Sequence, residues 1–99
     1  DINFLSYFKL RMTDYMEKRY AELAAKRAEK DAHIAKLVRL KKITKTAMLK
    51  AIADLEAEKL LSPELASDIE RIIAREVYVY TRTCEVLDDK IKAVEFRYG

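Results

Sequence analysis

Pro63 is the only proline of the 99-residue chain, and Gly99 is its only glycine. These two residue types supply most sharp turns and helix ends, so a chain almost without them has few places to reverse direction. Charged residues make up 37% of the sequence, and Ala, Leu, Lys, Glu and Arg dominate it. That composition is typical of helices. We therefore predict an all-α protein with a single helical domain over residues 1–99.

Residues 36–63 organise the predicted fold, because they separate two long amphipathic segments. The first long helix is predicted over residues 2–41, which contain neither glycine nor proline. Either Thr44 or Thr46 is expected to cap a short second helix that ends at Leu61. The first segment carries an apolar stripe with helical spacing of three and four, made of Leu5, Phe8, Met12, Met16, Tyr20 and Leu23, then Ile34, Leu37 and Val38.

The tetrapeptide Ser62-Pro63-Glu64-Leu65 is a helix-start pattern, with serine as the N-cap and proline at the first helical position. A third helix is predicted from Pro63 to about Tyr98. Its stripe runs through Leu65, Ile69, Ile72 and Ile73, then Tyr80, Cys84, Leu87, Ile91, Val94 and Tyr98. The prediction is thus a three-helix bundle in the order long, short, long.

The unequal helix lengths predict association. At about 1.5 Å per residue the three helices would span roughly 60, 25 and 50 Å. The first 20 residues of the first helix and the last 20 of the third would then lack a partner within the chain, although both carry apolar stripes. We expect an intertwined homodimer or larger oligomer to cover them. In the alternative, the first helix folds back at Asp31 and completes a four-helix bundle by itself.

The net charge of +3 is unevenly distributed along the chain. Residues 26–50 carry nine basic and two acidic side chains, residues 51–99 carry seven basic and eleven acidic ones, and residues 1–25 are balanced. A basic segment of this kind contacts nucleic acid or an acidic protein, or is simply a solvated face. The candidate contact residues are Lys36, Arg39, Lys41, Lys42, Lys45 and Lys50.

Two charged residues interrupt the apolar stripes of the long helices. Arg27 does so in the first helix, and Glu76 lies between Ile73 and Tyr80 in the third. A charge inside a bundle must be paired or hydrogen-bonded. One interpretation is a buried ion pair or a shifted helix face. The other is an anion-binding pocket within the bundle, with the candidate residues Arg27, Lys30, Glu76 and Arg82.

Metal and catalytic motifs are weak. His33 is the only histidine, and Cys84 is the only cysteine, so no intrachain disulfide forms and no zinc-ligand spacing is present. We predict no catalytic residues, no metal site and no cofactor. No apolar run approaches the roughly 20 residues that span a bilayer, so we expect no membrane span and a cytoplasmic location. The chain has no Gln and only one Asn, an amide-poor and charge-rich bias that is typical of thermophile proteins.

The order of helix lengths and two segments resemble the all-helical chorismate mutases. Residues 60–65, followed by Ile69 and Ile72-Ile73, are similar to that family's entry into its third helix. Residues 24–34 look like its first-helix segment that carries an active-site arginine, and Arg27 matches that arginine. The resemblance implies an intertwined dimer of about this size. The family's other functional positions differ, and are occupied here by Val38 (beside Arg39), Lys45, Met48 and Leu49, and Thr81 or Arg82.

The sequence therefore leaves two hypotheses for function. The first is a non-catalytic, self-associating helical assembly or scaffold protein, whose basic central segment contacts nucleic acid or an acidic partner. The alternative is a small helical enzyme similar to the chorismate mutases, in which Arg27 and Arg39 hold carboxylates inside the bundle. The missing acidic-basic signature of the second helix favours the first hypothesis.

Overall fold

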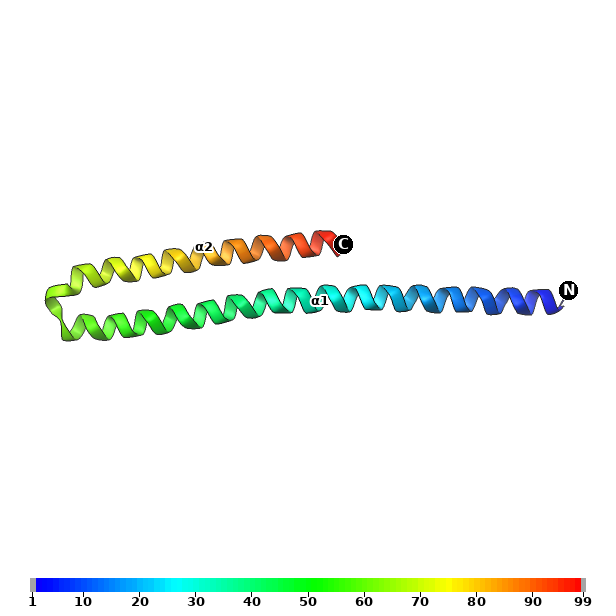
Figure 1. The fold of residues 1–99 in the computed structure, drawn as a ribbon, viewed down its shortest axis with the longest axis horizontal. Coiled ribbons are helices and arrows are strands. Elements are labelled where there is room, and N and C mark those ends of the chain that lie inside the picture. Colours follow the sequence, from blue (N-terminus) through cyan, green and yellow to red (C-terminus); the bar gives the residue numbers. More distant parts are fainter. Residues whose placement is uncertain (1, 99) are drawn as a thin grey trace.

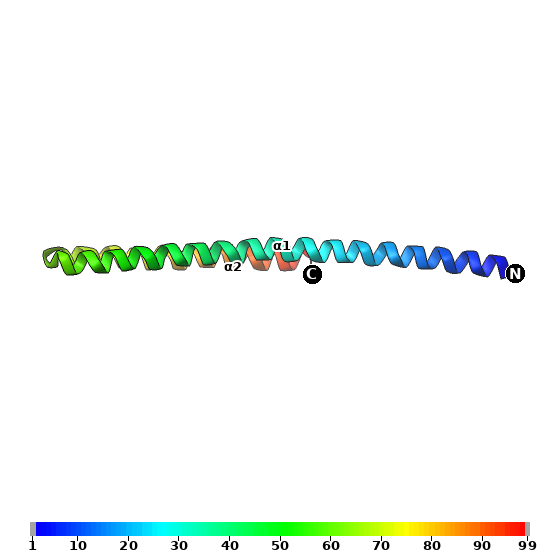
Figure 2. The same cartoon turned by 90° about the horizontal axis from the view of Figure 1, so that it is seen from below.

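The computed structural model describes residues 2–98, which form two antiparallel α-helices joined by a tight turn (Figure 1). Helix α1 spans Ile2–Leu61, the short 3-10 helix η1 spans Pro63–Leu65, and helix α2 spans Ala66–Tyr98. The Cα atoms extend over 94 × 19 × 8 Å, so the molecule is a rod one layer of helices thick. In Figure 2 the two helices overlap along their shared length. The predicted all-α class is confirmed for the described residues.

The predicted division of the first 61 residues into a long and a short helix is wrong, because α1 is continuous through both Asp31 and Thr44. The threonines cap nothing. Thr44 Oγ1 donates a hydrogen bond to the Leu40 carbonyl at 2.8 Å, and Thr46 Oγ1 donates to the Lys42 carbonyl at 3.0 Å. A threonine that bonds back to the preceding turn can stay inside a helix. The structure has two helices in place of the predicted three-helix bundle.

The chain reverses at Ser62, as the sequence pattern indicates. Ser62 leaves the helical conformation (φ −132°, ψ 74°), and Pro63 opens η1. The Ser62 hydroxyl makes no capping hydrogen bond; its backbone carbonyl accepts one from the Leu65 N–H at 2.9 Å. Proline at this position lacks a donor that the first turn of a helix would leave unpaired anyway. The local sequence thus stops α1 and starts the return helix without glycine.

Two ion pairs between α1 and α2 show the register in which the helices pack. Lys41 Nζ lies 2.6 Å from Asp88 Oδ1, and Lys59 Nζ lies 2.9 Å from Glu70 Oε1. The residue numbers in each pair add to 129, so in the same register Tyr98 lies opposite Asp31. Beyond this point α1 continues alone toward its N-terminus, as the cyan and blue part of the rod shows (Figure 1).

The apolar contact between the helices is narrow. Four side chains are buried, with 4% to 8% of their surface exposed, and no described side chain is completely enclosed. The main cluster lies toward the end of α2 and contains Leu37, Leu87 and Val94, with Ile34, Ile91 and Tyr98 packed around it. The expected unpaired C-terminal overhang is therefore wrong, because the residues assigned to it pack on α1. The N-terminal overhang is present.

Truncation of Leu37 tests this packing. We expect Leu37→Ala to lower the free energy of unfolding by about 2–3 kcal/mol, since it opens a cavity in the main cluster. Leu40→Ala removes the same atoms one turn away, where the side chain is 42% exposed, and should cost about 1 kcal/mol or less. Urea denaturation followed by circular dichroism measures both. Equal losses would contradict the packing described above.

Candidate functional site

The first feature that the fold leaves without a partner is the N-terminal overhang, defined as residues 2–23 of α1. At about 1.5 Å per residue it extends roughly 30 Å past the groove at the end of α2. Its apolar stripe is solvent-exposed, with each residue keeping 43% to 64% of its surface accessible to solvent. We call these six residues the overhang stripe: Leu5, Phe8, Met12, Met16, Tyr20 and Leu23.

Beside the overhang stripe, Tyr7 and Arg11 form a local pair on successive turns. The Arg11 guanidinium lies 5.6 Å from the centre of the Tyr7 ring, and its Nη1 donates to the Tyr7 hydroxyl at 2.7 Å. Residues four apart lie on the same helix face, so the pair shields part of the tyrosine ring. Contacts of this kind stabilise a solvated helix but leave the stripe itself uncovered.

A second surface is the groove where α2 ends on α1. Tyr98 of α2 lines it together with Leu23, Lys26, Arg27 and Lys30 of α1. Partial burial raises the pKa of the Tyr98 phenol, and the neighbouring Glu29 carboxylate acts in the same direction. Both effects favour the neutral phenol. Arg27 and Lys30, which the sequence suggested for an anion pocket, therefore do lie together at this groove.

The other two candidate pocket residues lie elsewhere along the hairpin. Glu76 of α2 faces Thr44 and Met48 of α1 in a separate groove. Arg82 pairs with Glu85 of its own helix, at 2.6 Å between Nη1 and Oε2. The structure does not bring Arg27 and Lys30 to Glu76 or to Arg82.

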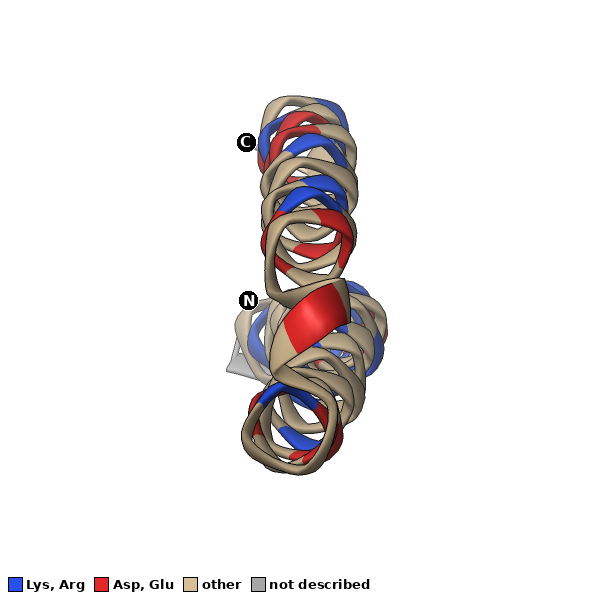
Figure 3. Ribbon diagram, turned by 90° about the vertical axis from the view of Figure 1, so that its left-hand side faces the viewer, with Lys and Arg blue, Asp and Glu red and all other residues tan. Residues whose placement is uncertain are grey.

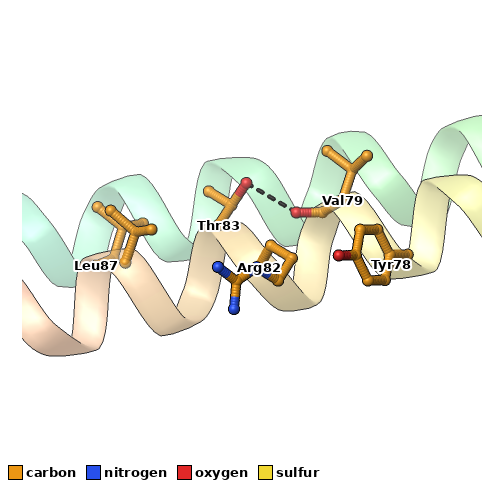
Figure 4. Close-up of a pocket in the computed structure, with 6 residues that line it drawn as sticks. Tyr78, Val79, Arg82, Thr83 and Leu87 are labelled. Carbon is orange, nitrogen blue, oxygen red and sulfur yellow. Dashed lines mark hydrogen bonds between the residues drawn. The ribbon is translucent and has the colours of Figure 1, made fainter.

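Arg82 also lines a shallow groove whose residues all belong to α2, including Tyr78, Val79 and Thr83 (Figure 4). The Thr83 hydroxyl donates to the Val79 carbonyl at 2.9 Å, so its only proton is already used within the helix. A groove formed by one helix does not enclose a substrate as an active site does.

The six candidate cations of the central segment divide into two groups. Lys41 points at α2 and is half-buried against Asp88. Within residues 2–98 the remaining five are exposed and form no ion pair within 4.0 Å: Lys36, Arg39, Lys42, Lys45 and Lys50. Arg39, Lys42 and Lys50 line one shallow groove built only from α1. Viewed along the rod, both helices carry charged bands of either sign (Figure 3).

A second exposed apolar series lies on α2, at one edge of the stripe that the sequence predicts for this helix. Ile72, Val79 and Val86 follow each other at intervals of seven residues and are each about half-exposed. A seven-residue interval keeps side chains on nearly one face of a helix. Val79 lines the same groove as Ala47 of α1, so this series borders the seam between the two helices.

The side chains capable of metal or redox chemistry are scattered. In the part of the chain that the structure describes, no three His, Cys, Asp or Glu residues are grouped to hold a metal ion. Cys84 is a half-buried free thiol, and His33 is exposed. Nor does any described helix have the length and apolar character needed to cross a membrane.

Comparison of the chain with models of protein families, with curated proteins and with solved structures finds no match. The resemblance to the chorismate mutases loses the long-short-long helix order on which it partly rested, because α1 is continuous. What remains of it is Arg27 and the residue pattern at the turn, and the activity stays a prediction. Function is argued below from the geometry of the hairpin.

The Lys41–Asp88 pair predicts a pH dependence of stability. Its hydrogen bond raises the pKa of Lys41 above the ordinary 10.5; partial burial opposes this, and the charge of Asp88 adds to it. A raised lysine pKa means that the folded hairpin holds the proton more tightly. Its stabilisation is therefore complete below pH 10.5 and is lost as the pH rises through the folded-state pKa.

We expect Asp88→Asn to remove this contribution. Urea denaturation at about pH 8 should show Asp88→Asn less stable than the parent, and the difference should shrink as the pH rises past 10.5 and through the raised pKa of Lys41. Asp89→Asn, which alters an exposed neighbour, is the matched control and should leave the alkaline loss of stability unchanged. If the difference between Asp88→Asn and the parent is constant over this range, the ion pair does not titrate as described.

Proposed function

We propose that this protein is a non-catalytic helical hairpin that associates with further copies of itself to build an assembly, with a homodimer as the smallest unit. The observation that carries the proposal is the exposed overhang stripe. Contiguous apolar surfaces of this size are uncommon on monomers and mark association sites. The Ile72, Val79 and Val86 series adds a second apolar surface on the flank of the hairpin.

The thin core supports the same proposal. A pair of helices buries one stripe on each, and among residues 5–98 only four side chains fall below a tenth of full exposure. Small folds with so little buried surface commonly obtain the rest of their stability from oligomerisation. Self-association would bury apolar residues that the hairpin cannot bury alone.

The outward cations of α1 support a contact with nucleic acid. Arg39, Lys42 and Lys50 border one groove, and Lys36 and Lys45 are exposed nearby in sequence. Cations without a carboxylate partner can neutralise phosphates and release counterions, which makes binding favourable and sensitive to salt. An acidic protein surface would be recognised by the same charges, so the binding test includes one.

A charge in the overhang stripe tests self-association. We expect Met12→Glu/Met16→Glu to convert the assembly to monomers, because two carboxylates would be buried at the contact. Ala21→Glu is the matched control, since it adds a carboxylate on the opposite side of the same helix and should leave the mass unchanged. Sedimentation equilibrium over a wide concentration range gives the mass. A parent protein that stays monomeric throughout would refute the proposal.

Removal of three outward cations tests the nucleic-acid contact. For Arg39→Ala/Lys42→Ala/Lys50→Ala, we expect weaker binding to a short DNA duplex and a logarithmic salt slope smaller by about 2–3, at about 0.9 per lost phosphate contact. The control Lys90→Ala/Lys92→Ala removes cations from exposed positions of α2 and should leave both the DNA affinity and the salt slope almost unchanged. Fluorescence anisotropy with labelled DNA and with labelled polyglutamate provides the readout. Binding to polyglutamate alone would replace nucleic acid by an acidic protein partner.

A further inference from the structure

The overhang stripe reads the same in both directions. Its residues are Leu5, Phe8, Met12, Met16, Tyr20 and Leu23. The steps between them are three, four, four, four and three residues, and the order of types is leucine, aromatic, methionine, methionine, aromatic, leucine. A helix face with this symmetry is complementary to itself when a second copy lies on it in the opposite direction. Leu5 then meets Leu23, Phe8 meets Tyr20, and Met12 meets Met16.

The structure places this stripe on the face of α1 that α2 covers further along. Helical steps of four, three, four and three connect Leu23 through Arg27 and Lys30 to Ile34 and Leu37, and the last two pack against α2. Because α1 is one continuous helix, positions linked by such steps share a face. The overhang stripe is therefore the uncovered continuation of the hairpin interface.

We propose that the overhang stripes of two copies pair with each other as antiparallel helices in the register that joins Leu5 to Leu23. This inference rests on the proposed self-association and names its geometry. In that register Ile2 of one copy lies opposite Lys26 of the other, whereas Tyr98 lies opposite Asp31 of its own α1. The helices of the two copies therefore follow each other along the same face of α1, and they meet at the groove where the Tyr98 side chain lies beside Leu23 and Lys26.

The hairpin itself selects the antiparallel direction. In a parallel pair, α1 of the second copy would follow the same face beyond Asp31, where α2 of the first copy already lies. Because α1 does not bend there, the two would collide. An antiparallel partner runs away from α2 and meets only the overhang.

The charges of the overhang permit this pairing. Residues 1–25 carry four basic and four acidic side chains, so two such segments approach without net repulsion, unlike two copies of the strongly basic residues 26–50. Lys9 falls opposite Arg19 in the proposed register. The Glu22 carboxylate, 3.5 Å from the Arg19 guanidinium, offsets that like-charge pair.

The area suffices for a specific contact. The six stripe residues are about half-exposed, and large side chains of this kind offer roughly 100 Å² each at that exposure. Complete coverage of both stripes would bury at most about 1,200 Å², which is the lower end of stable protein interfaces. Flanking residues such as Tyr15 add to it.

Cysteine cross-linking tests direction and register. In a Cys84→Ala background, unlabelled Leu5→Cys is mixed with ¹⁵N-labelled Leu23→Cys and oxidised, and intact-mass spectrometry counts the three possible disulfide dimers. We expect the mixed dimer to exceed each homodimer at least tenfold, since two copies of residue 5 would lie roughly 27 Å apart, beyond the reach of a disulfide. Ala21→Cys, on the opposite face, replaces Leu23→Cys as the control and should give no such excess.

The outcomes separate this inference from the broader proposal. Homodimers of Leu5→Cys and of Leu23→Cys without the mixed species would indicate parallel pairing and overturn the inference. Oligomers in sedimentation that form none of these disulfides would also overturn it, because another surface then makes the contact, while self-association would stand. If sedimentation found both the Cys84→Ala protein and the unaltered protein to be monomeric, this inference and the proposed self-association would both be overturned.

Discussion

A helix of 33 residues cannot cover a helix of 60. The remaining properties of the molecule follow from this mismatch and from the position of the one reversal, at Ser62 and Pro63. Had the turn stood near the middle of the chain, each helix would have covered the other and closed its stripe. Placed where it is, the turn leaves the apolar face of the overhang uncovered by α2, except at Leu23, which shares a groove with Tyr98. The proposed association rests on this difference in helix length.

The uneven charge of the sequence is used partly inside the hairpin. Lys41 comes from the basic segment and Asp88 from the acidic one, and Lys59 and Glu70 make a second link near the turn. Both pairs are partly solvated, so they add little stability. Their effect is on register, because a slip by one turn would separate both pairs at once. The cations that do not face α2 remain exposed on the outer side of α1, which is why the basic surface and the apolar stripe lie on different faces.

The helical class, the reversal of the chain at Ser62 and Pro63 and the exposed overhang were all predictable, because each depends on local composition or periodicity. The break before Thr44 was not a real feature. Extending an existing helix by one residue requires far less ordering than nucleating a new one, so two threonines do not interrupt it without glycine or proline nearby. The unpaired C-terminal overhang was wrong for the same reason: once the break is gone, α2 packs directly on residues 31–61.

The candidate pocket could not be predicted from the periodicity of the sequence, because periodicity does not give the register between the two helices. Arg27 and Glu76 both interrupt a stripe, but which residues meet across the hairpin follows from the register and not from the stripes. In the observed register Glu76 lies near Thr44 and Met48, while Arg27 lies beside Tyr98. The sequence indicated the faces of the helices correctly and placed their contacts incorrectly.

In the proposed assembly, association and helix stability would be coupled. Most helical stability in proteins comes from the packing of an apolar face, which the overhang lacks over most of its length. Its side-chain hydrogen bonds, from Arg11 to Tyr7 and from Thr13 to the Lys9 carbonyl, are local and contribute modestly. A second overhang on the stripe would give residues 5–23 the same two-helix environment that residues 31–61 have from α2. Antiparallel pairing would then extend one packing mode along the whole of α1, and the energy of association would appear largely as added stability of the overhang helix.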